Sequence, residues 1–243
     1  MERYKWVEMD GSSMMKQFTP GYSMEMAETE VRITRAVRDL GMEAAYPQKI
    51  VDKDGAIGIQ FDRVYGPNFR EWMQRNPASW SKMAALFAHE HHEMHMHQFP
   101  DLPSKRSIME QRIRDCPLLD NELRQKVLAI LKRLPEGENV CHWNFIPENV
   151  IFTINGPVVL DWQDAGKAHF LADVARTSVL LSLSVDDNLT KILQGTYITE
   201  YLKICGRPDE ELDRWGVVVA ADKLCDGVVE ERERLLELIQ RWL

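Results

Sequence analysis

The pattern of apolar and polar positions divides the chain into a strand-rich first part and a helical remainder. In the first part, short apolar runs are bounded by turn residues, which is typical of strands. Four strands are predicted there, at residues 4–9, 13–18, 49–52 and 57–64. Turns are expected at Asp10-Gly11 and Asp54-Gly55. Between the two pairs of strands, apolar residues recur at helical spacing over residues 24–40, and Gly41 is expected to end that helix.

Gly66-Pro67 breaks the strand pattern, and from there the apolar positions recur mostly at intervals of three and four residues, as in helices. Eight helices are predicted, over residues 69–75, 80–98, 108–116, 121–134, 171–184, 189–205, 210–221 and 222–243. Asp120 or Asn121 is expected to cap the fourth of them. We therefore predict an α+β fold, with a small β-rich part over residues 1–65 and a mostly helical part over residues 66–243.

A short hairpin is predicted within the helical part. Residues 149–153 and 157–161 are apolar runs, and Ile154-Asn155-Gly156 separates them. Asn-Gly between two apolar runs is a strong hairpin signal, because both residues tolerate positive φ. The hairpin would place Asn149, where the first strand begins, near Asp161, where the second strand ends. An amide oxygen and a carboxylate that converge in this way suit Mg²⁺, so we predict a magnesium site there.

Composition narrows the classes of function. The chain of 243 residues, 44% of them hydrophobic, is large enough for one domain with a substantial core. Its formal net charge of −8 argues against a general nucleic-acid binder and mildly favours a cationic small-molecule partner. No apolar run approaches the roughly 18 residues of a membrane span, and the first residues lack the apolar core of a secretory signal. Because its four cysteines show no CxxC pair, we expect reduced thiols in a cytoplasmic protein.

The region around the hairpin carries a set of motifs. In chain order they are His142-Trp143-Asn144, Asn149, Leu160-Asp161-Trp162 and Asp173-Val174-Ala175. In order and spacing they resemble the motifs of the aminoglycoside phosphotransferase / choline kinase family. Members of that family are related to protein kinases but phosphorylate small molecules. In that family the catalytic loop reads His-Gly-Asp, four residues and Asn. The metal strand reads Ile-Asp-Trp or Ile-Asp-Phe, and Asp-Leu-Ala or Asp-Val-Ala follows.

The resemblance implies a fold and an activity. The fold would be a two-lobed protein-kinase-like fold with a shortened N-terminal β-lobe and a mostly helical C-terminal lobe. The activity would be that of an ATP- and Mg²⁺-dependent phosphotransferase acting on a hydroxyl of a small molecule. Lys16 would contact the α- and β-phosphates, held by a glutamate on the next helix, for which Glu30 aligns best and Glu28 is the alternative. Asn149 and Asp161 correspond to the metal ligands of the family.

The resemblance also assigns supporting residues. His142 corresponds to the histidine that packs beneath the catalytic loop, and Asp173 to the aspartate that hydrogen-bonds the loop backbone. Neither is expected to exchange protons with a substrate. Asp164, three residues after Asp161, is either a second metal carboxylate or the cap of the following turn.

Asn144 departs from the family pattern, because it stands where the family has its catalytic Asp. Asparagine accepts a hydrogen bond through its side-chain oxygen but cannot take a proton at neutral pH. General bases contribute ~10²–10⁴-fold, whereas phosphoryl transfer depends largely on positioning and charge neutralisation. Three interpretations stay open: a slow or unusual kinase, a pseudokinase that binds nucleotide or another ligand, and an engineered Asn. Trp143, where the family usually has Gly, favours natural divergence over engineering.

Three further features bear on partners. No Gly-rich loop precedes Lys16, so we expect a shortened cover over the nucleotide, which the second subunit of a homodimer could complete. Five histidines, His89, His91, His92, His95 and His97, are interpreted as packing residues of one helix, with zinc binding by the i,i+4 pair of His91 and His95 as the alternative. The acidic residues of the C-terminal helices are interpreted as a solvated face rather than as a site for a cationic substrate. They are Asp222, Asp226, Glu230, Glu231, Glu233 and Glu237.

Overall fold

The computed structural model describes residues 4–53, 56–184 and 188–243, so the turn expected at Asp54-Gly55 lies outside the described residues. The chain forms two compact units. The first contains Met1–Trp72 and Pro147–Ala165, and the second contains Met73–Ile146 and Gly166–Leu243. The predicted hairpin thus belongs to the first unit, whereas the sequence pattern had placed it in the helical part.

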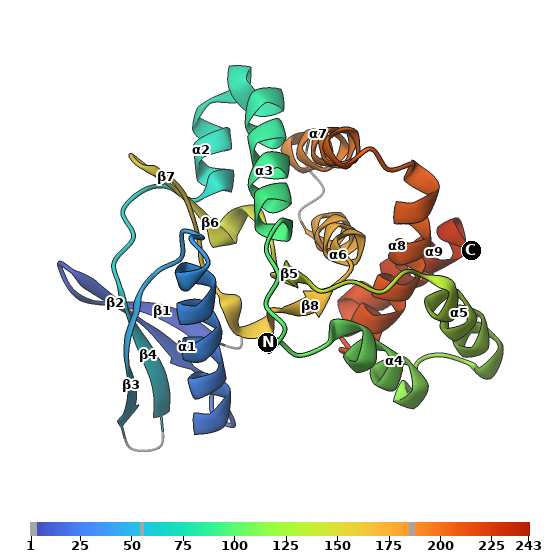
Figure 1. Cartoon of the computed structure of the whole chain (residues 1–243), viewed down its shortest axis with the longest axis horizontal. Coiled ribbons are helices and arrows are strands. Elements are labelled where there is room, and N and C mark those ends of the chain that lie inside the picture. The colour runs from blue at the N-terminus through green and yellow to red at the C-terminus, as the bar shows by residue number, and fades with distance from the viewer. Residues whose placement is uncertain (1–3, 54–55, 185–187) are drawn as a thin grey trace. The chain divides into compact units, whose positions relative to one another are not determined.

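A four-stranded antiparallel sheet is the main feature of the first unit (Figure 1). Its strands are β1 (Tyr4–Asp10), β2 (Ser13–Phe18), β3 (Pro47–Lys53) and β4 (Ala56–Asp62), in the order β1-β2-β4-β3. All four predicted strands are confirmed, with small shifts at their ends. Because β2 is a central strand, Lys16 has neighbours on both sides, Trp6 on β1 and Ile59 on β4. Lys16 therefore lies in the middle of the sheet.

The helix α1 (Met24–Asp39) packs on this sheet. It begins after Ser23, whose hydroxyl accepts a hydrogen bond from the N–H of Met26 at 3.2 Å. It ends as predicted at Gly41, which has a φ of 90° that favours glycine. The apolar face of α1 and the inner face of the sheet form one core, to which the hairpin also contributes. The buried members of that core are Phe18, Ala27, Val31, Ala45, Ile59, Phe61 and Leu160.

The hairpin forms, but its connection is one residue shorter than predicted, because Gly156 belongs to the second strand. Its strands are β6 (Val150–Thr153) and β7 (Gly156–Val159). Thr153 pairs with Gly156, so the turn consists of Ile154 and Asn155. The Thr153 hydroxyl explains the difference, because it donates to the Gly156 carbonyl at 2.7 Å and accepts from the Asn155 N–H at 3.1 Å. Positive φ is therefore needed at Gly156, where it is 122°, and not at Asn155.

Helices make up most of the second unit (Figure 1). They are α3 (Trp80–His95), α4 (Lys105–Asp115), α5 (Asn121–Arg133), α6 (Phe170–Leu183), α7 (Asn188–Cys205), α8 (Asp209–Leu224) and α9 (Arg232–Trp242). The short α2 (Phe69–Arg75) precedes them in the chain. Asp120 caps α5 as predicted, because its Oδ1 accepts from the Leu123 N–H at 2.8 Å. In the packing of this unit, α3 lies against α7, and α8 lies against both α6 and α9.

Some helix ends differ from the prediction. The last boundary was expected between residues 221 and 222, but α8 continues to Leu224 and α9 begins only at Arg232. The break occurs at Gly227, whose φ of 73° no helix accommodates. α3 ends at His95, so His97 lies beyond the helix, and Pro100 opposes any continuation. A two-stranded antiparallel ladder of β5 (Asn139–Cys141) and β8 (Gly166–Ala168) was not predicted, because each strand has only three residues.

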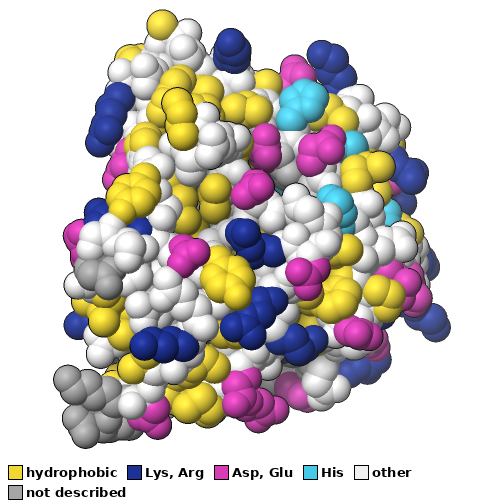
Figure 2. All heavy atoms as spheres, turned by 60° about the vertical axis from the view of Figure 1, so that its left-hand side comes forward, with side chains coloured by type: hydrophobic (Ala, Val, Ile, Leu, Met, Phe, Trp, Pro, Cys, Tyr) yellow, Lys and Arg dark blue, Asp and Glu magenta, His cyan; other side chains and the backbone are white. Residues whose placement is uncertain are grey.

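Acidic and basic side chains are interspersed with hydrophobic ones over the face drawn in Figure 2. That face therefore carries charges of both signs in close mixture rather than one extended area of a single sign. Across the described ranges, no helix combines the length and the apolar character that crossing a membrane would require.

Candidate functional site

Lys16 lies at the centre of a buried charge cluster in the first unit. Its Nζ atom is 2.7 Å from Oε1 of Glu30 and also contacts Oδ1 of Asp161. Lys16 lies on β2 and Glu30 lies on α1. Asp161 lies between β7 and the 3₁₀ turn that begins at Trp162. All three residues are buried, so solvent screens their attraction only weakly. Of the two glutamates considered for this partner, Glu30 contacts Lys16, whereas Glu28 is exposed.

Asp161 reaches this cluster through an unusual backbone conformation. It precedes the 3₁₀ turn η3 (Trp162–Asp164) and has a left-handed conformation, with φ 66° and ψ 59°. Few residues other than glycine adopt it, and Asp is one of those that tolerate it. The second carboxylate oxygen, Oδ2, accepts a hydrogen bond from the Tyr4 hydroxyl at 2.9 Å. The Tyr4 ring also lies 4.2 Å from Nζ of Lys16, measured to the ring centroid, so it is a cation–π partner of the same cluster.

Glu30 titrates unusually within this cluster. Burial raises the pKa of Glu30 to about 7, although the Lys16 ammonium opposes the rise; Asp161 and Asp164 add to it. Its Oε2 atom is buried and has no hydrogen-bond partner within the described residues. Glu30 therefore changes its charge in the neutral pH range, unlike an exposed glutamate.

We predict a pH dependence of stability from Glu30. Its pKa is about 7 in the folded chain and 4.5 ordinarily, so the folded chain binds more protons between these values. The free energy of unfolding of the parent should therefore fall, relative to that of Glu30→Gln, as pH rises from 4.5 to 7. Urea denaturation of both proteins across this range is the measurement, with Glu28→Gln on the same helix as the control. Parallel profiles for the parent and Glu30→Gln would contradict this prediction.

Asn149 stands at the same end of the hairpin as Asp161. It is the last residue of the 3₁₀ turn η2 (Pro147–Asn149) and is buried. Its backbone carbonyl accepts a hydrogen bond from the N–H of Leu160, the residue before Asp161, at 2.8 Å. The register of β6 and β7 thus brings the two predicted ligands together along the backbone, as the hairpin prediction required. Their amide and carboxylate oxygens are the hard donors that suit Mg²⁺, and their role as ligands stays a prediction.

The second unit contains the His142-Trp143-Asn144 loop, which α6 holds by its backbone. Oδ2 of Asp173, in the first turn of α6, accepts from the N–H of His142 at 2.6 Å, and Oδ1 accepts from the N–H of Trp143 at 2.9 Å. One turn later, the Thr177 hydroxyl donates to the Phe145 carbonyl at 2.9 Å. A packed helix therefore fixes the loop at three points, which is how a scaffold keeps a functional group in register.

The loop itself carries a second left-handed residue. Trp143 has a φ of 67°, which is rare for a bulky side chain, and its bond to Asp173 and its buried ring hold it there. The backbone N–H of Asn144 donates to Nδ1 of His142 at 3.2 Å. Because Nδ1 accepts this bond, the neutral imidazole carries its proton on Nε2. The Asn144 side chain, which stands in the catalytic Asp position by sequence, is thus attached to a backbone held from both sides.

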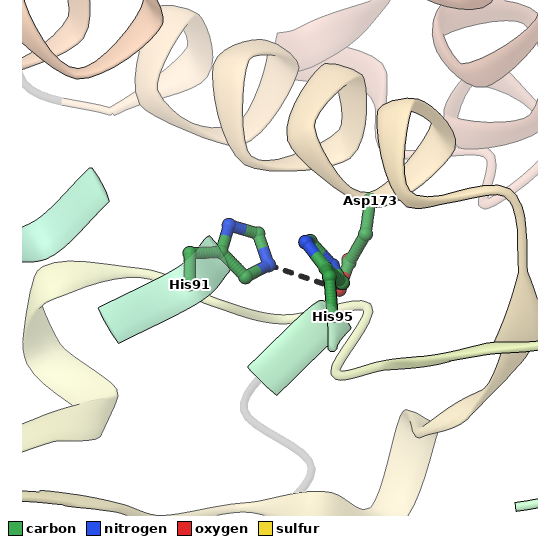
Figure 3. Close-up of side chains that lie close together, drawn as sticks. All are labelled: His91, His95 and Asp173. Carbon is green, nitrogen blue, oxygen red and sulfur yellow. Dashed lines mark hydrogen bonds and ion pairs between the residues drawn. The ribbon is translucent and has the colours of Figure 1, made fainter. Parts of the chain in front are cut away.

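Two histidines of α3 converge on Asp173, as Figure 3 shows. Nε2 of His91 lies 3.0 Å, and Nε2 of His95 lies 3.3 Å, from Oδ2 of Asp173. Burial alone would raise the pKa of Asp173, but His91 and His95 hydrogen-bond it and hold that pKa well below its usual range. Burial, with His95 nearby, lowers the pKa of His91 to about 3, so this imidazole is neutral at pH 7.

The packing interpretation of the histidines fits this geometry better than the zinc interpretation. His91, His95 and Asp173 form the one group of possible metal-ligating side chains found close together in the described part of the chain, with ligand atoms within 4.8 Å of one another. Their facing atoms are already joined by hydrogen bonds. The other histidines of this stretch do not share the cluster: His89 is exposed, and His92 and His97 are half-buried.

Comparison with known proteins identifies the family. Residues 8–211 match the family model described as Phosphotransferase enzyme family. The chain belongs to the phosphotransferase enzyme family. The matched range includes the Lys16 cluster, the hairpin and the loop with Asp173. No curated protein sequence matches the chain.

Solved structures of phosphotransferases share the fold of this chain. Amicoumacin kinase in complex with AMP-PNP, Ca²⁺ and Ami has a TM-score of 0.63 and 11% identity, over 99% of this chain and 87% of that chain. An aminoglycoside phosphotransferase from Streptomyces rimosus, in complex with ADP and streptomycin, has a TM-score of 0.59 and 16% identity, over 91% and 93%. Choline kinase from Cryptosporidium parvum Iowa II has a TM-score of 0.54 and 10% identity, over 98% and 87%. The predicted protein-kinase-like fold with a helical C-terminal lobe is confirmed.

In this member of the phosphotransferase family, the acidic residues near the C-terminus do not all form a solvated face. Asp222 is buried, with Nε of Arg112 at 2.7 Å from Oδ1 and one terminal nitrogen of Arg176 at 3.6 Å from Oδ2. Asp226 pairs with Arg112 at 2.5 Å and with Lys223 at 2.9 Å. The prediction of a solvated face is therefore wrong for Asp222, because α8 continues past residue 221 and buries it against α4 and α6.

Three tyrosines that contact the candidate residues of this phosphotransferase were not predicted. Tyr4 donates to Asp161, Tyr197 contacts His91, and Tyr201 contacts His95. Nothing in the sequence around Tyr4, which begins a strand, indicates that its hydroxyl contacts Asp161. Tyr197 and Tyr201 have the same i,i+4 spacing as His91 and His95, but spacing does not tell which helices face each other.

Proposed function

We propose that the protein is an ATP- and Mg²⁺-dependent phosphotransferase that transfers a phosphoryl group to a hydroxyl of a small molecule. The family supports phosphoryl transfer, and two of the structures that share the fold are complexes with AMP-PNP or ADP. The observation that carries the proposal is the buried Lys16, held between Glu30 and Asp161. In kinase-like proteins, a lysine held by a helix glutamate in this way contacts the phosphates of the nucleotide.

Four residues of the first unit have a role in this proposal. Lys16 contacts the α- and β-phosphates, and Glu30 keeps its ammonium group in place. Asn149 and Asp161 hold Mg²⁺, which when bound neutralises negative charge on the phosphate oxygens. Both oxygens of Asp161 have a protein partner, Tyr4 on Oδ2 and Lys16 on Oδ1, and because each carboxylate oxygen has more than one lone pair, Mg²⁺ can bind alongside these partners.

The loop of the second unit presents the acceptor hydroxyl. Asn144 orients the hydroxyl through its side-chain oxygen, because an amide accepts a hydrogen bond without taking the proton. As the hydroxyl oxygen bonds to the γ-phosphorus, the bond from that phosphorus to the departing oxygen of ADP breaks, and the hydroxyl proton leaves to a phosphate oxygen or to water. Because the transition state is loose, the missing base slows transfer without abolishing it. Asp173 and His142 hold the loop while this happens.

A second candidate function is a nucleotide- or ligand-binding module that has lost transfer. Asn144 favours it directly, and so does the bulky Trp143 in a left-handed conformation at a position where the family usually has Gly. The idea of a cationic acceptor finds no support in Asp222 and Asp226, because both carboxylates are paired with cations of the protein.

We also propose a cytoplasmic location. The four cysteines are free in the structure, which suits a reducing compartment. A homodimer that completes the cover over the nucleotide stays a prediction, for which the molar mass in solution is the test.

Nucleotide binding is the decisive test of the proposed site. We expect ATP with Mg²⁺ at about 100 times its Kd to stabilise the protein by about 2.7 kcal/mol, and Asp161→Asn to lose this stabilisation. The variant keeps the size of the side chain and removes the charge that Lys16 and the metal require. Thermal denaturation with and without ATP and Mg²⁺ is the measurement, and Asp39→Asn, at an exposed position of α1, is the matched control.

Two outcomes would count against the proposal. No stabilisation of the parent protein would mean that the Lys16 cluster does not bind the nucleotide. Equal stabilisation of the parent and Asp161→Asn would mean that ATP binds elsewhere on the chain.

A further inference from the structure

Two tyrosines of α7 extend the hydrogen-bonded network around Asp173. The Tyr197 hydroxyl lies 2.6 Å from Nδ1 of His91, and the Tyr201 hydroxyl lies 2.6 Å from Nδ1 of His95. Because both pairs have i,i+4 spacing on packed helices, they form two parallel connections, each from α7 through α3 to Asp173. We call Tyr197, His91, Tyr201 and His95 the Tyr-His ladder.

The protons of the ladder can be assigned from its acceptors. Asp173 is ionised and can only accept hydrogen bonds, so each histidine must present a proton on Nε2 to it. His91 is neutral, so its Nδ1 carries no proton and must accept from the Tyr197 hydroxyl. The Tyr201 hydroxyl lies at the same distance, 2.6 Å, from Nδ1 of His95. Burial raises the pKa of both Tyr197 and Tyr201 well above the usual value, so both phenols keep the proton that they donate. Tyr197 thus selects one tautomer of His91, and Tyr201 contacts His95 in the same geometry.

The tautomer matters for Asp173 because the same carboxylate holds the loop. Its Oδ2 accepts from two imidazoles and from the His142 N–H, and its Oδ1 accepts from the Trp143 N–H. In the other tautomer, a lone pair of the imidazole would face the negative oxygen and push the carboxylate away. Trp143 is held in a left-handed conformation that its bulky side chain disfavours, so it depends on a carboxylate with a fixed orientation.

We propose that Tyr197 and Tyr201 are positioning residues of the phosphotransferase, which fix His91, His95 and Asp173 and through them the backbone that carries Asn144. The effect on transfer rests on the proposed function, whereas the effect on the loop does not. Tyr201 acts through His95, whereas Tyr197 acts through His91 and through Thr177, to which it is also hydrogen-bonded and which donates to the Phe145 carbonyl. A mismatch of about 1 Å in a catalytic group costs about 10²-fold in rate, so a loosened loop has a measurable consequence.

Amide hydrogen exchange of the loop tests the ladder without any need for activity. In Tyr197→Phe, Tyr201→Phe and the double variant, the amides of residues 142 and 143 should exchange about 5-fold faster than in the parent, because a lost hydrogen bond of about 1 kcal/mol corresponds to that factor. Exchange within α3 and α7 should change little, since phenylalanine keeps the packed ring. Tyr46→Phe, at an exposed position of the first unit, is the control and should leave the loop unchanged.

Kinetics provide the second readout. The Tyr→Phe variants should lower kcat of phosphoryl transfer by about 10- to 100-fold and leave KM for ATP unchanged, because the ladder holds the acceptor loop and not the nucleotide. If the parent transfers no phosphate, the proposed function fails, and the exchange measurement still decides about the ladder.

Three results would overturn the inference. Unchanged exchange of the loop would show that the tyrosines do not position it. Exchange that rises equally in α3, α7 and the loop would show a general loss of packing. One equivalent of zinc in the purified protein, lost in His91→Asn and His95→Asn, would show that the cluster binds a metal instead.

Discussion

Asn144→Asp should accelerate phosphoryl transfer by about 10²–10⁴-fold, which is the range of a general base in enzymes. The substitution exchanges the side-chain amide for a carboxylate of the same size, so the acceptor hydroxyl gains a group that can take its proton. The backbone is expected to stay in place, because the Asn144 N–H donates to His142 and the neighbouring Trp143 N–H donates to Asp173. The measurement is ADP formation from ATP and Mg²⁺, with water and with a panel of hydroxyl-bearing acceptors.

Asn155→Asp is the matched control for this experiment. It introduces the same carboxylate at an exposed turn of the hairpin, so it changes the net charge without entering the loop. If Asn144→Asp still binds ATP with Mg²⁺ but transfers no faster than the parent, the loop is not a competent kinase frame. That result would favour the binding module over the enzyme.

Asp173→Ala should destabilise the protein by about 4 kcal/mol or more. The carboxylate accepts from the imidazoles of His91 and His95 and from the N–H groups of His142 and Trp143. Its removal leaves these four buried donors without an acceptor, and each such group costs about 1–3 kcal/mol. Urea denaturation at pH 7 gives the free energy of unfolding directly.

The position of Asp173, rather than the loss of a carboxylate as such, causes this effect. Asp213→Ala removes a carboxylate from an exposed position of α8 in the same unit, and its free energy of unfolding should change by less than about 0.5 kcal/mol. Asp173→Asn keeps the shape of the side chain but turns an NH₂ group toward some of the four donors, so it should lie between the parent and Asp173→Ala. A loss below about 1 kcal/mol in Asp173→Ala would contradict the role of Asp173 as the anchor of the loop.

Much of the local structure follows from the sequence, because short-range patterns determine it. The strands, the start of α1 at Ser23 and the cap of α5 at Asp120 depend on neighbours within four residues. The hairpin is also local, and its pairing alone brings Asn149 and Asp161 to one end. The predicted connection Ile154-Asn155-Gly156 was one residue too long, because Gly156 pairs with Thr153, whose hydroxyl also donates to the Gly156 carbonyl.

Some of the site was predicted through the motifs. Their spacing indicates which residues belong to the loop and to the hairpin, and Glu30 was the preferred partner of Lys16. The family itself could be suggested from these residues, and the match of residues 8–211 confirms it. How Asn144 acts could not be derived in this way, because an amide in place of a carboxylate is compatible with both transfer and binding alone.

By itself, the sequence determined most of the elements, the loop, the hairpin and the family, since these depend on residue types at fixed spacings along the chain, but it did not reveal the short β5–β8 ladder. Only the tertiary structure decided which side chains far apart in the sequence form hydrogen bonds or ion pairs with one another. Tyr4 meets Asp161 across 157 residues, and Tyr197 meets His91 across 106. Such contacts depend on which faces of strands and helices pack together, and hydrophobic burial, which is non-directional, leaves many pairings open until the whole core forms. Hydrogen bonds then select among them, because a buried donor or acceptor must find its partner.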